Sequence, residues 1–307
     1  MAHRCPRLTG TGPAASRTLL TRPPALAPLL ARGAVRSPFR RPRPDAPFPR
    51  TALVLPSVRV DPARLAAYER VCGFAAGDGT LPVTYPHVLG FPLAMRLMSG
   101  GGFPLPLLGL VHTSIAVTRH TALPATAAYE LTVRVTGLVP HRRGTEAVVA
   151  TELRGAGGDL VWESASTYLA RHRTAAAPPD TVDGGSGDGV AQERREAVPT
   201  VAQWRLSGDL GRRYGAVSGD RNPIHLYAFT ARAFGFPRPI AHGMWTVARC
   251  LAAHGTPGAA VVRARFRAPV PLPGAVAYGA DGDGRFELRG AGDGRLHLTG
   301  EVLPLHG

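Results

Sequence analysis

The sequence contains no lysine, and all of its 36 basic residues are arginine. Glycine (37 residues) and proline (30 residues) are abundant, so the arginine excess fits a general compositional bias. The net charge of +15 is also uneven, because residues 1–50 carry +9 and leave +6 for residues 51–307. A nucleic-acid-binding surface needs a basic stripe with interleaved aromatic residues, and residues 51–307 show none. We therefore expect no nucleic-acid partner.

Cysteine and long apolar runs are scarce as well. Cys5, Cys72 and Cys250 are far apart and form no CxxC pair, so a disulfide framework or zinc site is not expected. Cys250 lies in an apolar helical pattern that is typical of a buried thiol. No run approaches the roughly 20 apolar residues of a membrane span. These absences predict a soluble cytoplasmic protein without a metal or membrane segment.

Residues 1–50 are rich in proline and arginine and show no sustained periodicity. Their apolar stretch is interrupted by Pro23, Pro24 and Pro28, which are expected to break a helix. The composition is similar to that of a transit peptide, but no amphipathic helix or secretory apolar core is evident. We predict a disordered extension.

The rest of the chain divides at residues 174–200, where glycine, serine and proline predict a flexible linker. A hydrophobic fraction of 44% allows a core in each of the flanking domains, residues 51–173 and 201–307. In the first domain, helical periodicity at about 61–72 and 81–98 precedes four strand-like runs. These runs are Val111–Thr118, Ala127–Val139, Glu146–Arg154 and Leu160–Leu169.

The second domain has a similar order of elements. We predict a helix over residues 224–234 and another beginning near His242, followed by strands at Ala260–Arg267, Val276–Tyr278, Arg285–Arg289 and Leu296–Val302. Sequence echoes support a duplication: Pro86–Met98 is similar to Pro239–Leu251, and Leu110–Pro124 is similar to Val261–Pro273. Each half therefore places an apolar helix before antiparallel strands, which suggests a sheet wrapped around a helix.

One short stretch combines an acid, an amide and an imidazole. Asp220, Asn222 and His225 fall within six residues. The preceding Ser218 and Gly219 favour a turn, while Asn222 can cap a helix that begins at Pro223. Asp220 and His225 can then face one small volume, and such a pair is suited to proton transfer.

The motif from Ser218 to His225, followed by Ala241-His-Gly-Met244, resembles the MaoC-like, (R)-specific enoyl-CoA hydratase family. The strong match covers roughly residues 210–273, and the weaker repeat extends it to about 51–305. The resemblance implies an α+β double hot-dog fold, in which two antiparallel sheets each wrap around a central helix and join into one sheet. It also implies hydration or dehydration of trans-2-enoyl and 3-hydroxyacyl thioesters in fatty acid metabolism.

The same resemblance assigns roles to individual residues. Asp220 and His225 match the catalytic pair, and Asn222 matches a further polar residue of the site. Gly243 matches a glycine whose N–H binds the thioester oxygen. We count Ser218 with Asn222 and Gly243 among the substrate-binding residues, where its hydroxyl either orients Asp220 or simply closes the turn. No cofactor is implied, because CoA or an acyl-carrier protein arrives as part of the substrate. The N-terminal half lacks the motif, with Gly77-Asp-Gly-Thr80 in its place, and is expected to shape the acyl pocket.

Several alternatives remain open. The protein can be a dehydratase that acts on carrier-protein thioesters in fatty-acid or polyketide synthesis, or a non-catalytic subunit that binds acyl thioesters. A thioesterase is disfavoured, because its usual acid on the helix is missing. Asp220 and Asn222 also have simpler interpretations as turn and cap residues. His242 is left outside the catalytic set, and His87, His112 and His120 are interpreted as structural. Monomer and homodimer are both compatible with the sequence.

Overall fold

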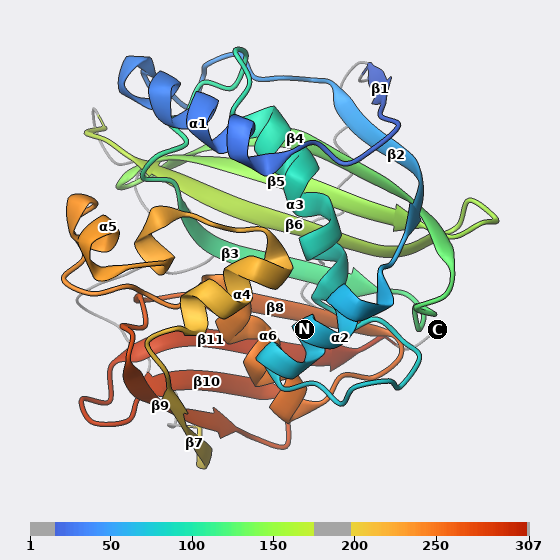
Figure 1. The fold of residues 1–307 in the computed structure, drawn as a ribbon, viewed down its shortest axis with the longest axis vertical. Coiled ribbons are helices and arrows are strands. Elements are labelled where there is room, and N and C mark those ends of the chain that lie inside the picture. The colour runs from blue at the N-terminus through green and yellow to red at the C-terminus, as the bar shows by residue number, and fades with distance from the viewer. Residues whose placement is uncertain (1–15, 175–197, 306–307) are drawn as a thin grey trace, which may run out of the picture.

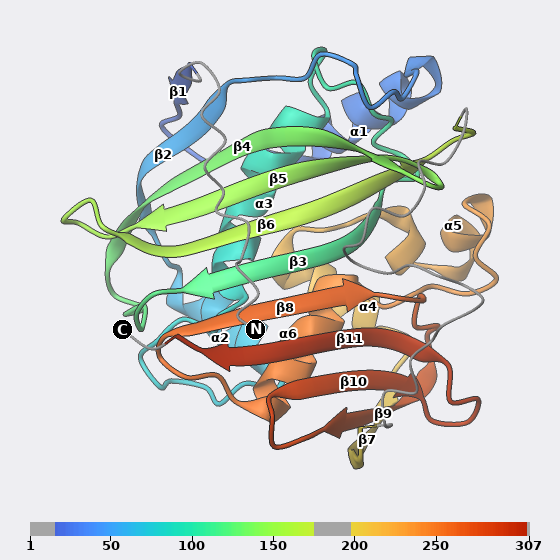
Figure 2. The same ribbon diagram turned by 180° about the vertical axis from the view of Figure 1, so that it is seen from behind.

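The computed structural model describes residues 16–174 and 198–305. Their strands form a single sheet, and the helices lie on one face of it (Figures 1 and 2). The strands are β1 (Arg17–Leu19), β2 (Ala52–Arg59), β3 (Val111–Arg119), β4 (Ala128–His141), β5 (Gly144–Arg154), β6 (Leu160–Arg171), β7 (Thr200–Leu206), β8 (Ala260–Phe266), β9 (Gly274–Ala280), β10 (Arg285–Gly290) and β11 (Leu296–Pro304). Their order across the sheet is β1-β2-β4-β5-β6-β3-β8-β11-β10-β9-β7.

The central helix of the N-terminal half is α3 (Tyr85–Met98), which crosses β4, β5 and β6 (Figure 1). Ten of its 14 residues are buried, as expected for a helix that is enclosed by protein on most sides. Pro86 sits in the first turn, where its missing N–H costs no hydrogen bond. Gly90 lets the helix approach the sheet, since a Cβ there would lie 2.9 Å from the Thr151 methyl.

The C-terminal half repeats this arrangement around α6 (Gly243–His254). The helix packs on the sheet formed by β7 to β11, and seven of its 12 residues are buried. Its Trp245 Nε1–H donates to the Val71 carbonyl at 2.9 Å. Val71 belongs to α2 (Pro62–Cys72) of the other half, so this bond ties the two helical layers together.

The halves join through strands β3 and β8. These pair antiparallel from Ser114 opposite Arg265 to Arg119 opposite Ala260. Apolar residues of both halves belong to one buried cluster, which includes Ile115, Val117 and Val262. The predicted strands and the two central helices are therefore confirmed, as is their union into one continuous sheet.

The prediction of a disordered extension is wrong for residues 16–50; residues 1–15 lie outside the described part. β1 pairs parallel with β2, and α1 (Leu26–Arg36) covers one end of α3. The prolines do not prevent this helix, because Pro28 is its third residue and N–H groups of the first turn have no helical partner. The predicted linker core, residues 175–197, also lies outside the described part.

Arginines of this segment hold it against the end of α3. Arg40 donates to the carbonyls of Gly100 and Gly101 at 2.8 and 2.7 Å, and Arg36 donates to the Ser99 carbonyl at 3.3 Å. These three carbonyls follow Met98, the last residue of α3, where the negative end of the helix dipole also attracts a positive charge. Arginines of residues 16–50 thus help to hold this segment against the N-terminal half.

The helix predicted at residues 224–234 is divided in two. A 3₁₀ turn, η2 (Pro223–His225), is followed by α5 (Ala228–Ala233). Tyr227 between them has extended backbone, and the Leu226 carbonyl accepts from the Arg212 guanidinium at 3.1 Å. His225 therefore belongs to η2 and is not part of α5.

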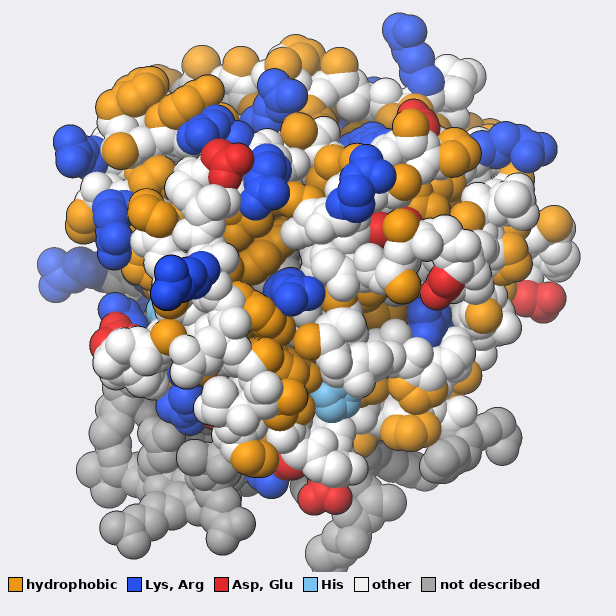
Figure 3. All heavy atoms as spheres, turned by 60° about the horizontal axis from the view of Figure 1, so that its bottom comes forward, with side chains coloured by type: hydrophobic (Ala, Val, Ile, Leu, Met, Phe, Trp, Pro, Cys, Tyr) orange, Lys and Arg blue, Asp and Glu red, His pale blue; other side chains and the backbone are white. Residues whose placement is uncertain are grey.

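On the face in Figure 3, arginines are scattered among apolar and acidic side chains and form no continuous band. In the described ranges, no helix is long and apolar enough to cross a membrane.

Candidate active site

The helix α4 (Leu210–Ser218), which was not predicted, forms the support for the motif. A Cβ at Gly211 would overlap the His225 carbonyl oxygen, and one at Gly215 would lie 2.8 Å from the Asp220 carbonyl oxygen. The two glycines are four residues apart and therefore lie on one helix face. They let the motif backbone rest directly on α4, and this spacing is the signal that sequence reasoning missed.

Asp220 is held by a set of short local hydrogen bonds. Gly219 ends α4 with a φ of +83°, which a side chain rarely adopts. The Ser218 hydroxyl donates to the Tyr214 carbonyl at 2.8 Å and accepts from the Asp220 N–H at 3.2 Å. Asp220 Oδ1 in turn accepts from the Asn222 N–H at 3.1 Å. The carboxylate remains 28% exposed, so it can still meet a ligand.

Two of the residues assigned to the substrate have structural partners. The buried Ser218 hydroxyl positions the Asp220 backbone and faces away from solvent. The Asn222 side-chain oxygen accepts from the Ile224 N–H and caps η2, which leaves its amide N–H groups for a ligand.

His225 is buried, and one hydrogen bond determines the tautomer of its ring. Its Nδ1 lies 2.7 Å from the Ile240 carbonyl oxygen. A carbonyl accepts only, so Nδ1 carries the proton and Nε2 presents a lone pair. Burial lowers the pKa of His225, and the nearby Asp220 carboxylate and the Ile240 carbonyl offset part of that effect. A neutral imidazole with a free acceptor therefore faces the site.

His242, which sequence reasoning left outside the catalytic set, lies directly against the motif residues. Its Nε2–H donates to the Asp220 carbonyl at 2.9 Å, and its ring stacks on His225 with centroids 3.7 Å apart. Tyr214 packs beside the same ring, at 4.9 Å. Burial, followed by the neighbouring His225, holds the pKa of His242 well below its usual value. The His-Gly-Met sequence was the available signal for this positioning residue.

The N-terminus of α6 adds a hydrogen-bond donor. His242 is its N-cap and makes no side-chain capping bond. The first helical N–H groups lack a partner within the helix, and the helix dipole favours negative charge there. Gly243 is the first residue, and a Cβ on it would lie 2.8 Å from the Phe266 ring. Glycine thus allows the Phe266 ring to lie directly against the first turn of α6.

The structure brings Asp220, His225 and His242 together, with one ring nitrogen or carboxylate oxygen of each within 4.8 Å of the others. Two acceptors at this separation can share one water molecule. The same composition can also hold a metal, because a histidine that donates one ring N–H to a carbonyl, as His225 and His242 do, keeps its second nitrogen for a ligand. The geometry suits activation of a water next to a developing oxyanion.

Comparison with known proteins supports this chemistry. Residues 191–302 match the family model described as "MaoC like domain". Over 291 residues, the chain is 36% identical to 3-hydroxyacyl-thioester dehydratase X of Mycobacterium tuberculosis; the match covers 93% of this chain and 100% of the relative. The chain belongs to the MaoC-like dehydratase family.

Solved structures confirm the architecture of this MaoC-like protein. The crystal structure of HtdX from Mycobacterium tuberculosis matches with a TM-score of 0.70 at 34% identity, over 83% of this chain and 100% of that chain. A second protein of that organism, described as having a double hotdog fold, matches with a TM-score of 0.51 at 13% identity, over 81% and 94% of the two chains. The expected α+β double hot-dog fold is confirmed.

The N-terminal half of this MaoC-like chain differs from the motif half in a specific way. Gly90 aligns with Gly243 in the sequence repeat, but it is the sixth residue of α3 and lies inside the helix. Its N–H is therefore placed to bond within the helix. Asp78, in the place of the motif acid, accepts from the Thr80 N–H and hydroxyl at 3.0 and 2.7 Å. The first half thus lacks the donor as well as the histidine.

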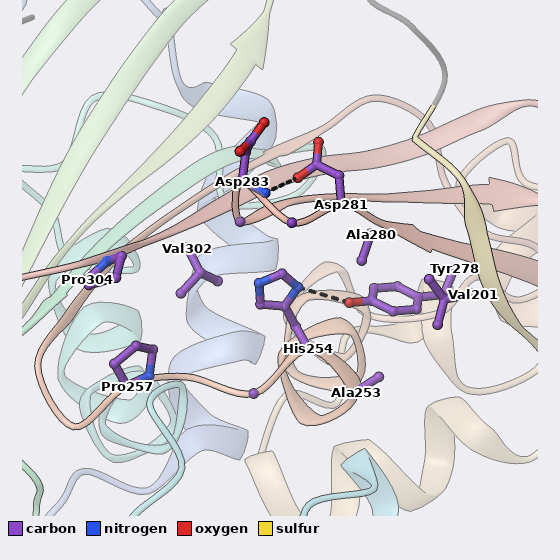
Figure 4. Close-up of a pocket in the computed structure, with 13 residues that line it drawn as sticks. Val201, Ala253, His254, Pro257, Tyr278, Ala280, Asp281, Asp283, Val302 and Pro304 are labelled. Atoms are coloured by element: carbon purple, nitrogen blue, oxygen red, sulfur yellow. Dashed lines mark hydrogen bonds between the residues drawn. The ribbon is translucent and has the colours of Figure 1, made fainter.

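A separate pocket lies at the other end of α6 (Figure 4). It has a volume of about 530 Å³. His254 points into it with Nδ1 3.1 Å from the Tyr278 hydroxyl, while Asp281 accepts from the Asp283 N–H at 3.0 Å. At 1.5 Å per residue, α6 places this pocket about 17 Å from Gly243. It is therefore far from Asp220 and His225.

Proposed function

We propose that the protein catalyses the (R)-specific interconversion of trans-2-enoyl and 3-hydroxyacyl thioesters. It would be a hydro-lyase, with Asp220 and His225 as the catalytic pair. The observation that carries the proposal is their placement within reach of one water, next to the N-terminus of α6. The names of the relatives, a 3-hydroxyacyl-thioester dehydratase and an enoyl-CoA hydratase that is 30% identical over 173 residues, agree with this reaction.

The proposed hydration uses one water for both new bonds. Asp220 Oδ2 and His225 Nε2 are acceptors, so a water that donates to both has its oxygen free to attack the β-carbon. One acceptor takes the water proton as the C–O bond forms. That proton is then delivered to the α-carbon, and the catalytic pair returns to its starting state. Dehydration follows the same path in reverse.

Addition at the β-carbon places negative charge on the thioester oxygen. The Gly243 N–H and the dipole of α6 are in position to stabilise that charge. The Asn222 amide offers a second polar contact to the substrate, whereas Ser218 and His242 act by holding Asp220. The mechanism needs no cofactor beyond the CoA or carrier that the substrate brings.

The decisive experiment replaces the catalytic pair and measures hydration of crotonyl-CoA. Asp220→Asn and His225→Gln should each lower kcat by roughly 100- to 10,000-fold, which is the usual contribution of general acid–base catalysis. Asp209→Asn is the matched control, because its side chain is 46% exposed and pairs with Arg213 on α4. Unchanged circular dichroism would show that the fold is intact, and near-wild-type rates in either variant would contradict the mechanism.

Two alternatives are separated by substrate and by turnover. A carrier-protein dehydratase would process the crotonyl thioester of an acyl-carrier protein faster than crotonyl-CoA. A non-catalytic subunit would bind acyl-CoA tightly without forming product. We place the reaction in the cytoplasm, in fatty acid metabolism; the free, buried thiols of Cys72 and Cys250 fit a reducing compartment. A homodimer is compatible with this function but not required by it.

A further inference from the structure

A small cavity in the N-terminal half is lined by polar side chains. It lies between α3 and strands β5 and β6, and its polar wall is formed by His87, Thr151, Ser166 and Tyr168. Apolar residues of α3 and β5 complete the wall. Its volume is about 10 Å³, which is close to the least that holds one water molecule. The cavity therefore suits a single small polar group.

Two polar atoms at this place have no hydrogen-bond partner among the described residues. The Ser166 hydroxyl is one of them, and only 2% of this residue is exposed. The Ser166 hydroxyl is close enough to Tyr168 to oppose the rise of the Tyr168 pKa that burial causes. The two hydroxyl groups nevertheless lie outside the usual geometric limits of a hydrogen bond. The second atom is Nε2 of His112, whose ring stacks on Tyr168 at 4.6 Å and on His87 at 5.8 Å. Buried polar groups are normally satisfied, so an absent partner is indicated.

The cavity is electrically neutral at ordinary pH. Burial lowers the pKa of His87 to about 4 and raises the pKa of Tyr168, so both side chains are uncharged. The Asp220 carboxylate is close enough to raise the pKa of each. Its negative charge would oppose a second anion at this place. A neutral donor or acceptor is the chemistry that fits.

A chain of ring contacts connects the cavity with the catalytic helix. Phe266 packs against Gly243 at the start of α6. The Phe266 ring lies 4.8 Å from His112, and His112 stacks on the cavity residues His87 and Tyr168. Two aromatic rings, those of Phe266 and His112, thus lie between the cavity and the place where the Gly243 N–H would bind the thioester oxygen. The cavity is on the side of the N-terminal half.

We propose that this cavity is a specificity site for an acyl chain that carries a neutral oxygen-bearing group, such as a hydroxyl or a keto group. The Ser166 hydroxyl and its polar neighbours would replace the hydrogen bonds that this group leaves in water. The inference rests on the proposed function, because it concerns the acyl chain of the same substrate.

The test compares paired substrates of equal length. We would measure kcat/KM for trans-2-hexenoyl-CoA and trans-2-octenoyl-CoA, each with and without a terminal hydroxyl, and for the corresponding terminal carboxylates. The wild type should prefer the hydroxylated member at one of these lengths and should discriminate against the carboxylate. Ser166→Ala should lower the hydroxyl preference about five- to tenfold, as expected for the loss of one hydrogen bond.

Ser164 provides a matched control on the same strand. It is equally buried, at 2% exposure, and its hydroxyl also has no described partner, but it does not line the cavity. Ser164→Ala should therefore leave the preference and both rates unchanged. Saturated acyl-CoA pairs, whose dissociation constants are measured by calorimetry, give the same comparison without turnover.

The outcomes separate this inference from the proposed function. If the enzyme hydrates unsubstituted enoyl-CoA but shows no hydroxyl preference at either length, the cavity holds only a structural water and the inference is overturned. An equal effect of Ser164→Ala and Ser166→Ala would overturn it as well. A third outcome is that no enoyl thioester is hydrated, while the hydroxylated acyl-CoA still binds more tightly than its unsubstituted partner. The proposed function would then be wrong, but the specificity site would be supported.

Discussion

Two neutral imidazoles lie side by side next to the Asp220 carboxylate. His225 keeps an acceptor nitrogen toward the site, and His242 uses its N–H on the Asp220 backbone. A proton on either ring would add charge to a buried stack with centroids 3.7 Å apart. The site is thus built for uncharged histidines, and acid should harm both its catalysis and its stability.

The sign of the pH effect follows from the lowered pKa values. Burial lowers the pKa of His87, His225 and His242 below the value of about 6.5 in an unfolded chain. The unfolded chain then binds more protons below pH 6.5, so these groups reduce the free energy of unfolding as the pH falls. For His87 the loss extends down to its folded pKa of about 4.

We therefore expect the free energy of unfolding to fall between pH 7.5 and pH 5, with roughly 1 to 2 kcal/mol coming from His87. Urea titrations at the two pH values measure the change. His87→Gln removes one titrating group and should lessen the loss by that amount. An equal loss in wild type and variant would mean that His87 does not titrate as proposed.

At the scale of elements, the N-terminal segment is held by the end of α3. Arg40 makes two charge-assisted bonds to the Gly100 and Gly101 carbonyls, in the turn that follows the last residue of α3, Met98. Its positive charge also lies near the negative end of the helix dipole. Arg40→Met should lower the free energy of unfolding by about 1 to 3 kcal/mol. Thermal unfolding measures this loss. Arg41→Met is the control, because Arg41 is exposed, and a similar loss in both variants would contradict the capping role.

The same elements show how far the sequence could lead. Strands with alternating β-branched residues and helices with strong apolar patterns were placed correctly, because burial on a sheet or around a helix leaves that pattern. The helices α1 and α4 were missed for local reasons. Pro28 occupies a first turn, and α4 carries Gly211 and Gly215 for contact with the motif. Tertiary contacts outweigh helix propensity at both places.

The site was predictable in part for a related reason. Asp220 and His225 lie in one short motif, so their proximity follows from the sequence alone. The stacking of His242 on His225, and the packing of Phe266 beside Gly243, depend on how α6 and β8 meet the motif loop. Contacts between distant segments leave no local pattern, which is why the polar cavity at Ser166 was also not foreseen.

At the scale of the whole molecule, two similar halves share one sheet but differ in chemistry. The C-terminal half has an acid, a histidine and a helix that begins at its glycine. In the N-terminal half, α3 begins five residues before Gly90, and the Asp78 carboxylate is engaged by Thr80. One active site per chain is therefore expected, whatever the number of chains in the assembly.

This asymmetry can be tested by making the same substitution in both halves. Asp78→Asn should leave kcat for crotonyl-CoA within about twofold of wild type, whereas Asp220→Asn should nearly abolish it, because only Asp220 faces a histidine acceptor and a free helix N-terminus. A saturated acyl-CoA should bind with a stoichiometry of one per chain in calorimetry. Two binding events per chain, or an equal loss of rate in the two variants, would show that the N-terminal half is catalytic.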